Sequence, residues 1–254
     1  MANELNVVGL MNAQLAYQDD EIYIIEVNPR ASRTIPFVSK ATGVALANIA
    51  VRAMTGISLK EQGFIKEVIP KHYSVKESVF PFNKFLGVDP YLGPEMRSTG
   101  EVMGIGHDFP SACDKAFLAA GDIIPTSGKV FVSLRTLDRE RLVELGERLN
   151  NQGFEIVATR TNQEILQNAG LECTMVNKVS EGSPHIVDLV KNDEISLIIS
   201  STEDTQGLED AAVIRCQALV HKVPCMTTVA AAFATLDGLK THDKMIVRSL
   251  QSLQ

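Results

Sequence analysis

The sequence predicts an α/β protein in two parts: an incomplete α+β region over residues 1–121, and a three-layer α/β domain with a parallel sheet over residues 122–254. Two observations lead to this prediction. After Gly121, short apolar runs alternate with helical segments, which is typical of right-handed βαβ crossovers and of a sheet covered on both faces. Before Gly121, the chain opens with a lone hairpin, which is marginal in water. We therefore expect the first part to be the end of a larger sheet domain.

The composition is that of an ordinary globular chain. Its 254 residues are 45% hydrophobic and 22% charged, close to the average of globular proteins. The net charge of −7, the absence of Trp and an aromatic content of 6% argue against a nucleic-acid surface. No apolar run approaches the roughly 18–20 residues that span a bilayer, and the N-terminus lacks a signal-peptide pattern. These features predict a cytoplasmic protein that binds neither nucleic acid nor membrane.

The first part begins with two predicted strands, over residues 5–18 and 21–28, joined by a tight turn at Asp19 and Asp20. Pro29 removes a backbone donor and ends the second strand. Residues 34–54 are predicted to be helical, with a division into two helices at Gly43. The rest of this part is predicted as a strand at 73–81, a loop at 83–94, a strand at 98–104 and a helix at 109–120 that Gly121 ends.

The second part alternates strands with helices. The predicted strands are 130–134, 154–158, 173–176, 195–200 and 223–227, and the predicted helices are 138–150, 162–169, 184–191, 208–221 and 228–239. The first of these helices repeats leucines on one face, and Asp138 is predicted as its N-cap. Ser183 and Pro184 are predicted as a cap and a first helical residue.

The cysteines and histidines show no metal-binding spacing. The four cysteines include no C-x-x-C pair, and the five histidines are scattered. We therefore expect reduced, structural thiols and no transition-metal site.

Polar side chains are expected to gather on one face of the opening hairpin. Glu26 and Asn28 project to the same side of their strand, because side chains two residues apart share a face. A turn near Asp20 predicts that Gln14 lies opposite Glu26 and that Asn12 lies opposite Asn28. The other face is predicted to carry Leu15, Ile25 and Val27.

This set of side chains suits a hard cation and phosphate. Magnesium prefers oxygen ligands from one or two carboxylates, with phosphate oxygens completing its shell. Arg30 and Arg33 follow at the exit of the strand, where guanidinium groups can clamp phosphates or a developing anion. The pattern therefore indicates nucleotide phosphoryl chemistry. Alternating polar residues on a half-exposed hairpin are also common as a solvated face, and this second interpretation stays open.

Longer runs of residues resemble a known family. Residues 26–30 (EVNPR), with residues 37–43, 73–77, 81–85 and 93–104, resemble the end of the second ATP-grasp domain of the carbamoyl-phosphate synthetase large subunit. Residues 176–179 and 181–186 resemble the methylglyoxal-synthase-like regulatory domain of the same subunit. The resemblance covers essentially the whole chain, more loosely after about residue 105, and implies roughly the last quarter of that ligase subunit.

The resemblance implies roles for the hairpin residues. Gln14, Glu26 and Asn28 match magnesium or manganese ligands of the second ATP site, where Gln14 and Glu26 also contact ATP. Arg30 and Arg33 match catalytic positions near its phosphates. The family makes carbamoyl phosphate, for arginine and pyrimidine biosynthesis, from bicarbonate, glutamine-derived ammonia and two ATP. The implied partners are the remainder of the large subunit and a glutaminase small subunit, without which we expect no turnover.

The resemblance also implies an effector site in the second part. A strand that runs into a helix N-terminus makes an anion site, at the edge where parallel α/β sheets bind ligands. The positions that match those holding uridine or inosine monophosphate are Ser133, Arg139, Thr159, Lys178, Thr202 and Asp210. Thr161 replaces a glycine of the family, Asn162 a threonine and Ser200 an asparagine. We therefore expect the anion pocket to persist and the pyrimidine response to be weakened or lost.

A second effector position matches the ornithine site of the family. Glu77 and Thr227 are its candidates in this chain, and Cys225 stands where the family has a tyrosine. The other acids of that site would precede this chain, so we expect no measurable ornithine binding.

Two other functions stay open. Residues 122–254 alone would act in a stand-alone, non-catalytic nucleotide- or phosphate-binding regulatory module. A free-standing methylglyoxal-synthase-like lyase is the other alternative, although no carboxylate base stands beside the candidate phosphate loop, and a fold does not supply a function.

Overall fold

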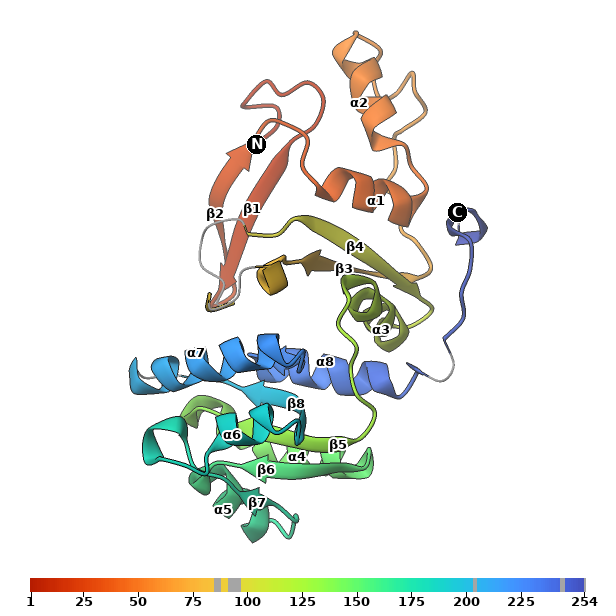
Figure 1. Ribbon diagram of the computed structural model, residues 1–254. Helices are drawn as coiled ribbons and strands as arrows, with labels where there is room; N and C mark the ends of the chain where they lie inside the picture. Colours follow the sequence, from red (N-terminus) through yellow and green to blue (C-terminus); the bar gives the residue numbers. More distant parts are fainter. Residues whose placement is uncertain (85–87, 91–96, 203–204, 243–244, 254) are drawn as a thin grey trace. The chain divides into compact units, whose positions relative to one another are not determined.

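The computed structural model describes residues 1–84, 88–90, 97–202, 205–242 and 245–253. The chain forms two compact units: Met1–Tyr73 with Ile246–Gln254, and Ser74–Met245. Figure 1 gives the element labels used below. The sequence predicts a domain boundary after Gly121, and this position lies inside the second compact unit. The predicted boundary separates two regions of family resemblance rather than two compact units, and it stays a prediction.

The first unit opens with an antiparallel hairpin of β1 (Asn12–Gln18) and β2 (Glu21–Asn28). Asp19 and Asp20 both adopt positive φ, as the two-residue turn of a twisted hairpin requires. The predicted first strand began at residue 5, but β1 begins at Asn12, whose partner Asn28 ends β2. Pro29 follows and has no N–H to donate, so the ladder does not continue.

Two helices complete the regular elements at this end of the chain, α1 (Thr34–Thr42) and α2 (Leu46–Met54). Gly43 separates them, as predicted, in a left-handed conformation that a residue with a Cβ rarely adopts. No single described helix is both long and apolar enough to cross a membrane; α1 and α2 satisfy the length and composition criteria only as a pair, which is bent by 113°. A 3₁₀ turn, Leu250–Leu253, lies near the C-terminus.

The second unit contains a two-stranded sheet of β3 (Tyr73–Val79) and β4 (Gly100–Gly106), on which α3 (Phe109–Ala120) packs. Asp108 caps α3 by accepting a hydrogen bond from the Ser111 N–H at 2.8 Å, and Gly121 ends the helix, as predicted. Helix and sheet approach closely at Gly104, where a Cβ would overlap backbone atoms of α3. The loop predicted at 83–94 lies partly outside the described residues, and Phe82–Lys84 form a 3₁₀ turn.

A five-stranded parallel sheet forms the rest of this unit, in the order β7-β6-β5-β8-β9. Its strands are β5 (Gly128–Ser133), β6 (Phe154–Ala158), β7 (Thr174–Met175), β8 (Ile195–Ser200) and β9 (Cys225–Met226). Its helices are α4 (Leu142–Asn151), α5 (Arg160–Asn168), α6 (Ile186–Lys191), α7 (Thr205–Val220) and α8 (Val229–Leu239). The predicted three-layer α/β architecture is confirmed.

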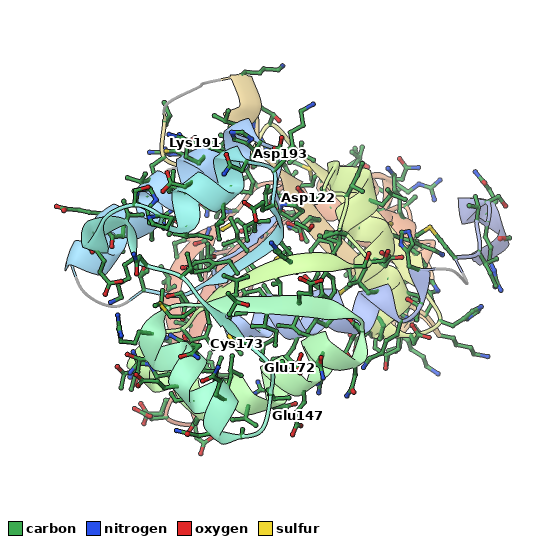
Figure 2. All side chains as sticks on the ribbon, turned by 60° about the horizontal axis from the view of Figure 1, so that its bottom comes forward. Asp122, Glu147, Glu172, Cys173, Lys191 and Asp193 are labelled. Atoms are coloured by element: carbon green, nitrogen blue, oxygen red, sulfur yellow. The ribbon has the colours of Figure 1, made fainter. Side chains whose placement is uncertain are left out.

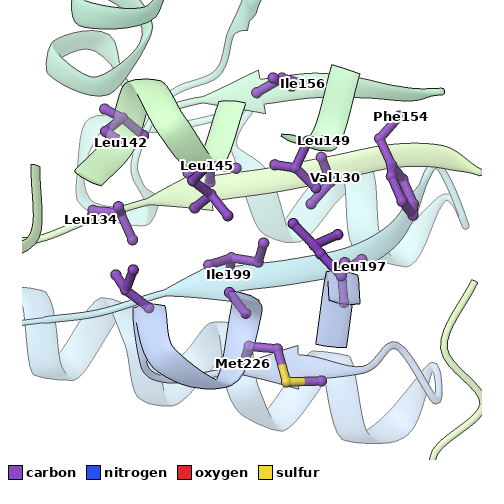
Figure 3. Packing of buried hydrophobic residues seen from close by; sticks show 14 of the residues in the cluster. Val130, Leu134, Leu142, Leu145, Leu149, Phe154, Ile156, Leu197, Ile199 and Met226 are labelled. Atoms are coloured by element: carbon purple, nitrogen blue, oxygen red, sulfur yellow. The ribbon is translucent and has the colours of Figure 1, made fainter. Parts of the chain in front are cut away.

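The core lies on both faces of this sheet because side chains alternate along each strand. On β5, Val130 and Val132 face α4, α5 and α8, whereas Phe131 faces α6 and α7. Figure 3 shows the first of these layers, in which the α4 leucines, Leu145 among them, are fully buried against the sheet. Figure 2 shows charged side chains such as Glu147 at the periphery.

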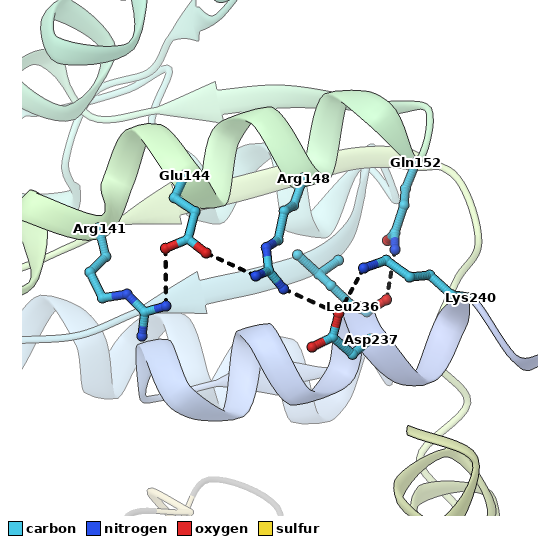
Figure 4. A network of polar contacts seen from close by, with 7 residues as sticks. All are labelled: Arg141, Glu144, Arg148, Gln152, Leu236, Asp237 and Lys240. Atoms are coloured by element: carbon cyan, nitrogen blue, oxygen red, sulfur yellow. Dashed lines mark hydrogen bonds and ion pairs between the residues drawn. The ribbon is translucent and has the colours of Figure 1, made fainter. Parts of the chain in front are cut away.

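Charged side chains join α4 to α8 across the outside of this layer (Figure 4). Arg148 bridges Glu144 on its own helix, at 2.8 Å, and Asp237 on α8, at 3.1 Å. The guanidinium groups of Arg141 and Arg148 also lie 4.1 and 4.6 Å from the ring centre of Phe233. These contacts place two cations on an aromatic ring and hold the two helices together.

Two predicted helix caps are wrong. Asp138 lies within a 3₁₀ turn, η2 (Thr136–Arg141), where it accepts a hydrogen bond from Arg135 Nε at 2.9 Å, and α4 begins only at Leu142. Pro184 lies outside α6, after a cis peptide bond. His185 is the N-cap instead, with an extended backbone, and the carboxylate of Asp188 in the first turn accepts its N–H at 2.9 Å.

Candidate functional site

The polar face of the hairpin forms with the predicted register. Gln14 pairs with Glu26, and Asn12 pairs with Asn28. Nearer the turn the pairing shifts by one residue, so that Leu15 lies opposite Ile24. A β-bulge accommodates the additional residue, and the apolar face carries Ile24 beside Leu15 where Ile25 was predicted.

The polar face carries side chains of the types that a hard cation accepts as ligands. Asn28 Nδ2 donates a hydrogen bond to Glu26 Oε1 at 2.8 Å, so the amide group of Asn28 has to turn over before its oxygen and that carboxylate can bind one cation. Gln14 and Glu26 are exposed, and Asn28 is half-buried. One carboxylate and two amide carbonyls are oxygen ligands of the kind that magnesium accepts, with phosphate and water completing its shell. Among the described residues, no three His, Cys, Asp or Glu side chains gather around a common metal position.

The two arginines follow this face at the exit of β2. Arg30 is exposed; its N–H donates to the Asn28 carbonyl at 2.8 Å, and its guanidinium donates to the Ala31 carbonyl at 3.3 Å. Arg33 is the N-cap residue of α1. The chain therefore leaves β2 with both cations within a few residues of the oxygen ligands.

The second candidate site lies at the carboxyl edge of the parallel sheet. Ser133 ends β5, Thr159 follows β6, Lys178 follows β7 and Thr202 follows β8. Parallel strands bring these ends to one edge. Ser133 Oγ and Thr159 Oγ1 lie 3.4 Å apart, so the structure places two of the predicted effector residues side by side.

Of the other predicted effector residues, Arg139 and Asp210 are hydrogen-bonded to their neighbours at this edge. Arg139 donates from Nε to the Leu134 carbonyl at 3.3 Å. Lys178 is exposed, at the start of a 3₁₀ turn, η3 (Val179–Glu181). Asp210 on α7 accepts from the Ser180 hydroxyl, in that turn, at 2.8 Å. The carboxylate predicted to bind an effector thus also fastens α7 to the turn that follows Lys178.

Asn162 is a residue that the sequence marked only as a departure from the family. It is 2% exposed, in the first turn of α5. Its Oδ1 accepts from the Leu134 N–H at 3.1 Å, and its Nδ2 lies 3.4 Å from the Leu134 carbonyl oxygen and 3.2 Å from Thr159 Oγ1. The only signal in the sequence was a polar residue at the start of a helix that follows a strand. That signal does not identify the partners, because Leu134 is 28 residues away and Thr159 is three residues away.

A wide cavity of about 1360 Å³ lies beside the sheet in the second unit. Its lining includes Ser78, Thr202, Arg215, Cys225 and Thr227. Thr202 and Thr227, predicted for the nucleotide and the ornithine sites, therefore line one continuous cavity. Glu77 precedes Ser78 on β3.

Burial raises the pKa values of one carboxyl group and three thiols in the second unit. Burial raises the pKa of Glu77, and the charge of Asp122 adds a smaller increase. Burial raises the pKa of the Cys225 thiol to about 12, so it stays protonated at neutral pH. Burial likewise raises the pKa values of Cys113 and Cys173 to about 11.

A half-buried ion pair was missed by the sequence analysis. Asp89 accepts two hydrogen bonds from Arg215 on α7, from Nε at 2.8 Å and from Nη2 at 2.7 Å. The Arg215 side chain is only 10% exposed. The partners are 126 residues apart, and no local pattern signals such a pair.

Comparison with known proteins gives matches along the whole chain. Residues 1–62 match the model of the carbamoyl-phosphate synthase L chain, ATP binding domain, and residues 141–227 match that of the MGS-like domain. The carbamoyl phosphate synthase large chains of Pseudomonas putida and Pseudomonas syringae pathovar tomato are each 55% identical over 253 residues, and that of Vibrio cholerae is 52% identical. Each alignment covers 100% of this chain and 24% of the relative, so the chain spans about a quarter of the length of these relatives.

A solved methylglyoxal synthase from Elizabethkingia anophelis is 16% identical, with a TM-score of 0.37 over 44% of this chain and 79% of that one, a likeness too distant to carry weight. The family models and the large-chain relatives confirm the resemblance predicted from the sequence motifs.

Proposed function

We propose that this chain, which corresponds to the C-terminal quarter of carbamoyl phosphate synthase large chains, supplies the metal-binding hairpin for carbamate phosphorylation and an effector domain to a glutamine-dependent ligase. The observation that carries the proposal is the 55% identity over the whole chain, with the two family models matched in order. The remaining large chain, a glutaminase subunit and a cytoplasmic location belong to the same proposal.

The polar face of the hairpin is the proposed metal site. Gln14, Glu26 and Asn28 would hold Mg²⁺ or Mn²⁺ through one carboxylate and two amide oxygens, and Gln14 and Glu26 would also face ATP. A divalent cation supplies charge neutralisation and orientation at the transferring phosphoryl group. The exposure of Gln14 and Glu26 supports this role, since phosphate oxygens need access to the same cation.

Arg30 and Arg33 are the proposed catalytic cations. Phosphoryl transfer spreads negative charge over the equatorial oxygens, and guanidinium groups stabilise that charge by forked hydrogen bonds. Arg30 is exposed at the exit of β2, two residues after Asn28, which supports a position beside the phosphates.

The carboxyl edge of the parallel sheet is the proposed nucleotide effector site. Ser133 and Thr159 would donate hydroxyl hydrogen bonds to a phosphate group, with Lys178 and Arg139 supplying positive charge. Thr202 and Asp210 would contact the rest of uridine or inosine monophosphate. The 3.4 Å separation of the two hydroxyl oxygens supports a shared anion position. Glu77 and Thr227 are the proposed remnants of an ornithine site, and titration of ornithine into this chain is expected to give no heat.

A partial-reaction assay tests the catalytic part of the proposal. In the assembled synthetase, Glu26→Gln is expected to abolish ATP formation from ADP and carbamoyl phosphate and to leave bicarbonate-dependent ATP hydrolysis largely intact. Glu21→Gln is the matched control, because Glu21 is also an exposed carboxylate of β2, at the turn. Equal loss of both partial reactions in Glu26→Gln would contradict the assignment.

The stand-alone regulatory module is the second candidate, because the five-stranded sheet has a complete core on both faces. Mixing this chain with a separately produced N-terminal portion distinguishes the two functions. Carbamoyl phosphate formation in the mixture supports the ligase. Nucleotide binding by this chain, without any activity in the mixture, supports the module.

A further inference from the structure

Both donor hydrogens and the acceptor oxygen of the Asn162 side-chain amide are hydrogen-bonded inside the protein. Both Nδ2 hydrogens have partners, the Leu134 carbonyl oxygen and Thr159 Oγ1, and Oδ1 accepts the Leu134 N–H. At 2% exposure, this side chain cannot reach a ligand without breaking those bonds. The amide therefore acts on its neighbours.

Thr159 is the neighbour whose hydroxyl this amide controls. Thr159 is 4% exposed and is the N-cap residue of α5, a nine-residue helix. Threonine at this position ordinarily accepts a hydrogen bond from the first turn of its helix. Among the described residues of α5, none donates a capping hydrogen bond to the Thr159 side chain. Its oxygen accepts from Asn162 Nδ2 instead.

This hydrogen bond excludes one direction for the Thr159 hydroxyl proton. A hydroxyl has one hydrogen to donate and two lone pairs to accept with. Since Asn162 Nδ2 can only donate, the Thr159 hydrogen is turned away from it, toward Ser133 Oγ or toward a ligand at the same edge. The Asn162 bonds to both backbone groups of Leu134 hold the end of β5, and with it Ser133, at this place.

We propose that Asn162 is a positioning residue of the effector site: its amide, without touching the ligand, orients the Thr159 hydroxyl as a donor toward a bound phosphate or sulfate group. This inference rests on the proposed effector function. Asn162 thus maintains anion binding in this chain although it stands where the family has a threonine.

A double-mutant cycle on the full chain tests the inference. The probes are inorganic sulfate, which stays a dianion over the pH range used, and uridine monophosphate, with affinities measured by calorimetry. Asn162→Ala and Thr159→Val are each expected to weaken sulfate binding about tenfold, as for loss of a hydrogen bond to a charged group. The double variant is expected to lose clearly less affinity than the sum of the two single losses, because Asn162 acts largely through Thr159 and only in a smaller part through the end of β5. Additive losses would overturn the positioning role.

A second variant keeps the test valid if Asn162→Ala unfolds. Asn162→Asp has nearly the same shape, but its ionised carboxylate accepts only, so it draws the Thr159 proton inward and repels the anion. Sulfate affinity is expected to fall more than tenfold at pH 8 and to recover at pH 5, since burial raises the pKa of an aspartate and its protonated form regains a donor. A loss that is the same at both pH values would contradict the inference.

Gln163→Glu is the matched control, because it makes the same exchange of amide for carboxylate on the next residue. It is expected to keep sulfate affinity within about threefold, and an equal loss would show that charge alone explains the Asn162→Asp result. If the unmodified chain binds neither sulfate nor uridine monophosphate, the proposed effector function itself fails, and the role of Asn162 falls with it.

Discussion

The hairpin and the five-stranded sheet are built from similar strands but differ in burial. Ile22 and Ile24 of β2 are 68% and 57% exposed, whereas Ile198 of β8 is fully buried. The difference follows from what covers each sheet: helices pack on both faces of the parallel sheet, while the described part of the first unit leaves the hairpin's apolar face open. Strand-forming residues therefore define a strand, and neighbouring elements decide whether it stabilises the protein.

Truncation of one leucine in each region is expected to give the largest difference in the free energy of unfolding between the parallel sheet and the hairpin. Leu145→Ala removes a fully buried side chain between α4 and the sheet, and we expect a loss of about 2–5 kcal/mol in the free energy of unfolding. Leu15→Ala removes a side chain that is 53% exposed, and we expect a change within about 0.5 kcal/mol. Urea unfolding followed by circular dichroism measures both; equal losses would mean that the hairpin face is covered in solution.

Removal of a buried charge partner is the next largest effect. Asp89→Ala leaves Arg215 buried without its bidentate carboxylate, and we expect a loss of about 3 kcal/mol, since Asp89 itself is partly exposed. Asp193→Asn is the control, because Asp193 pairs with His221 but its side chain is 82% exposed, and asparagine tolerates the left-handed backbone at this position. Its loss is expected to be below about 1 kcal/mol. Comparable losses in the two unfolding curves would contradict the structural importance of the Asp89 pair.

Two glycines of β4 test how closely a helix packs on the two-stranded sheet, because only one of them lies against α3. Gly104→Ala places a Cβ against the backbone of α3 at Ala112, and we expect a loss of about 1–3 kcal/mol or more. Gly100→Ala, on the same strand, meets no atom within 4 Å and is expected to be nearly neutral. Thermal unfolding of the two variants is the measurement. A stable Gly104→Ala variant would show that α3 and β4 are less closely packed than described.

The smallest expected effect is a pH dependence of the protein's stability that comes from Glu77 on β3. Burial raises the folded-state pKa of Glu77 above that of the unfolded chain. Its stabilising contribution is therefore fully present below the unfolded pKa and is lost as pH rises through the folded pKa. Glu77→Gln should raise the unfolding midpoint at pH 7 and leave it unchanged at pH 3, relative to the unmodified chain. Glu147→Gln, at an exposed position of α4, should change neither. A midpoint lowered at pH 7 would reverse the sign and contradict the burial argument.

Local signals in the sequence determined much of this fold. The helix from Phe109 to Ala120 was predicted with both of its bounds, and Gly121 was the signal for its C-terminal end. The strand Phe154–Ala158 was likewise predicted, and the Asp19-Asp20 turn predicted which residues of the polar face lie opposite each other. Each of these features depends on residues within a few positions of one another, where turn chemistry, capping and periodicity act.

Only the tertiary structure decided the features that join distant residues. The bulge that brings Ile24 beside Leu15 depends on how two strands pair, and the Asp89–Arg215 ion pair joins residues that are 126 positions apart. The role of the Asn162 side chain becomes clear only in the folded chain, where its Oδ1 lies 3.1 Å from the backbone nitrogen of Leu134, 28 residues earlier. A side chain's chemistry is written in the sequence, but its role depends on the partners that folding places around it, and no periodic pattern specifies partners so far apart.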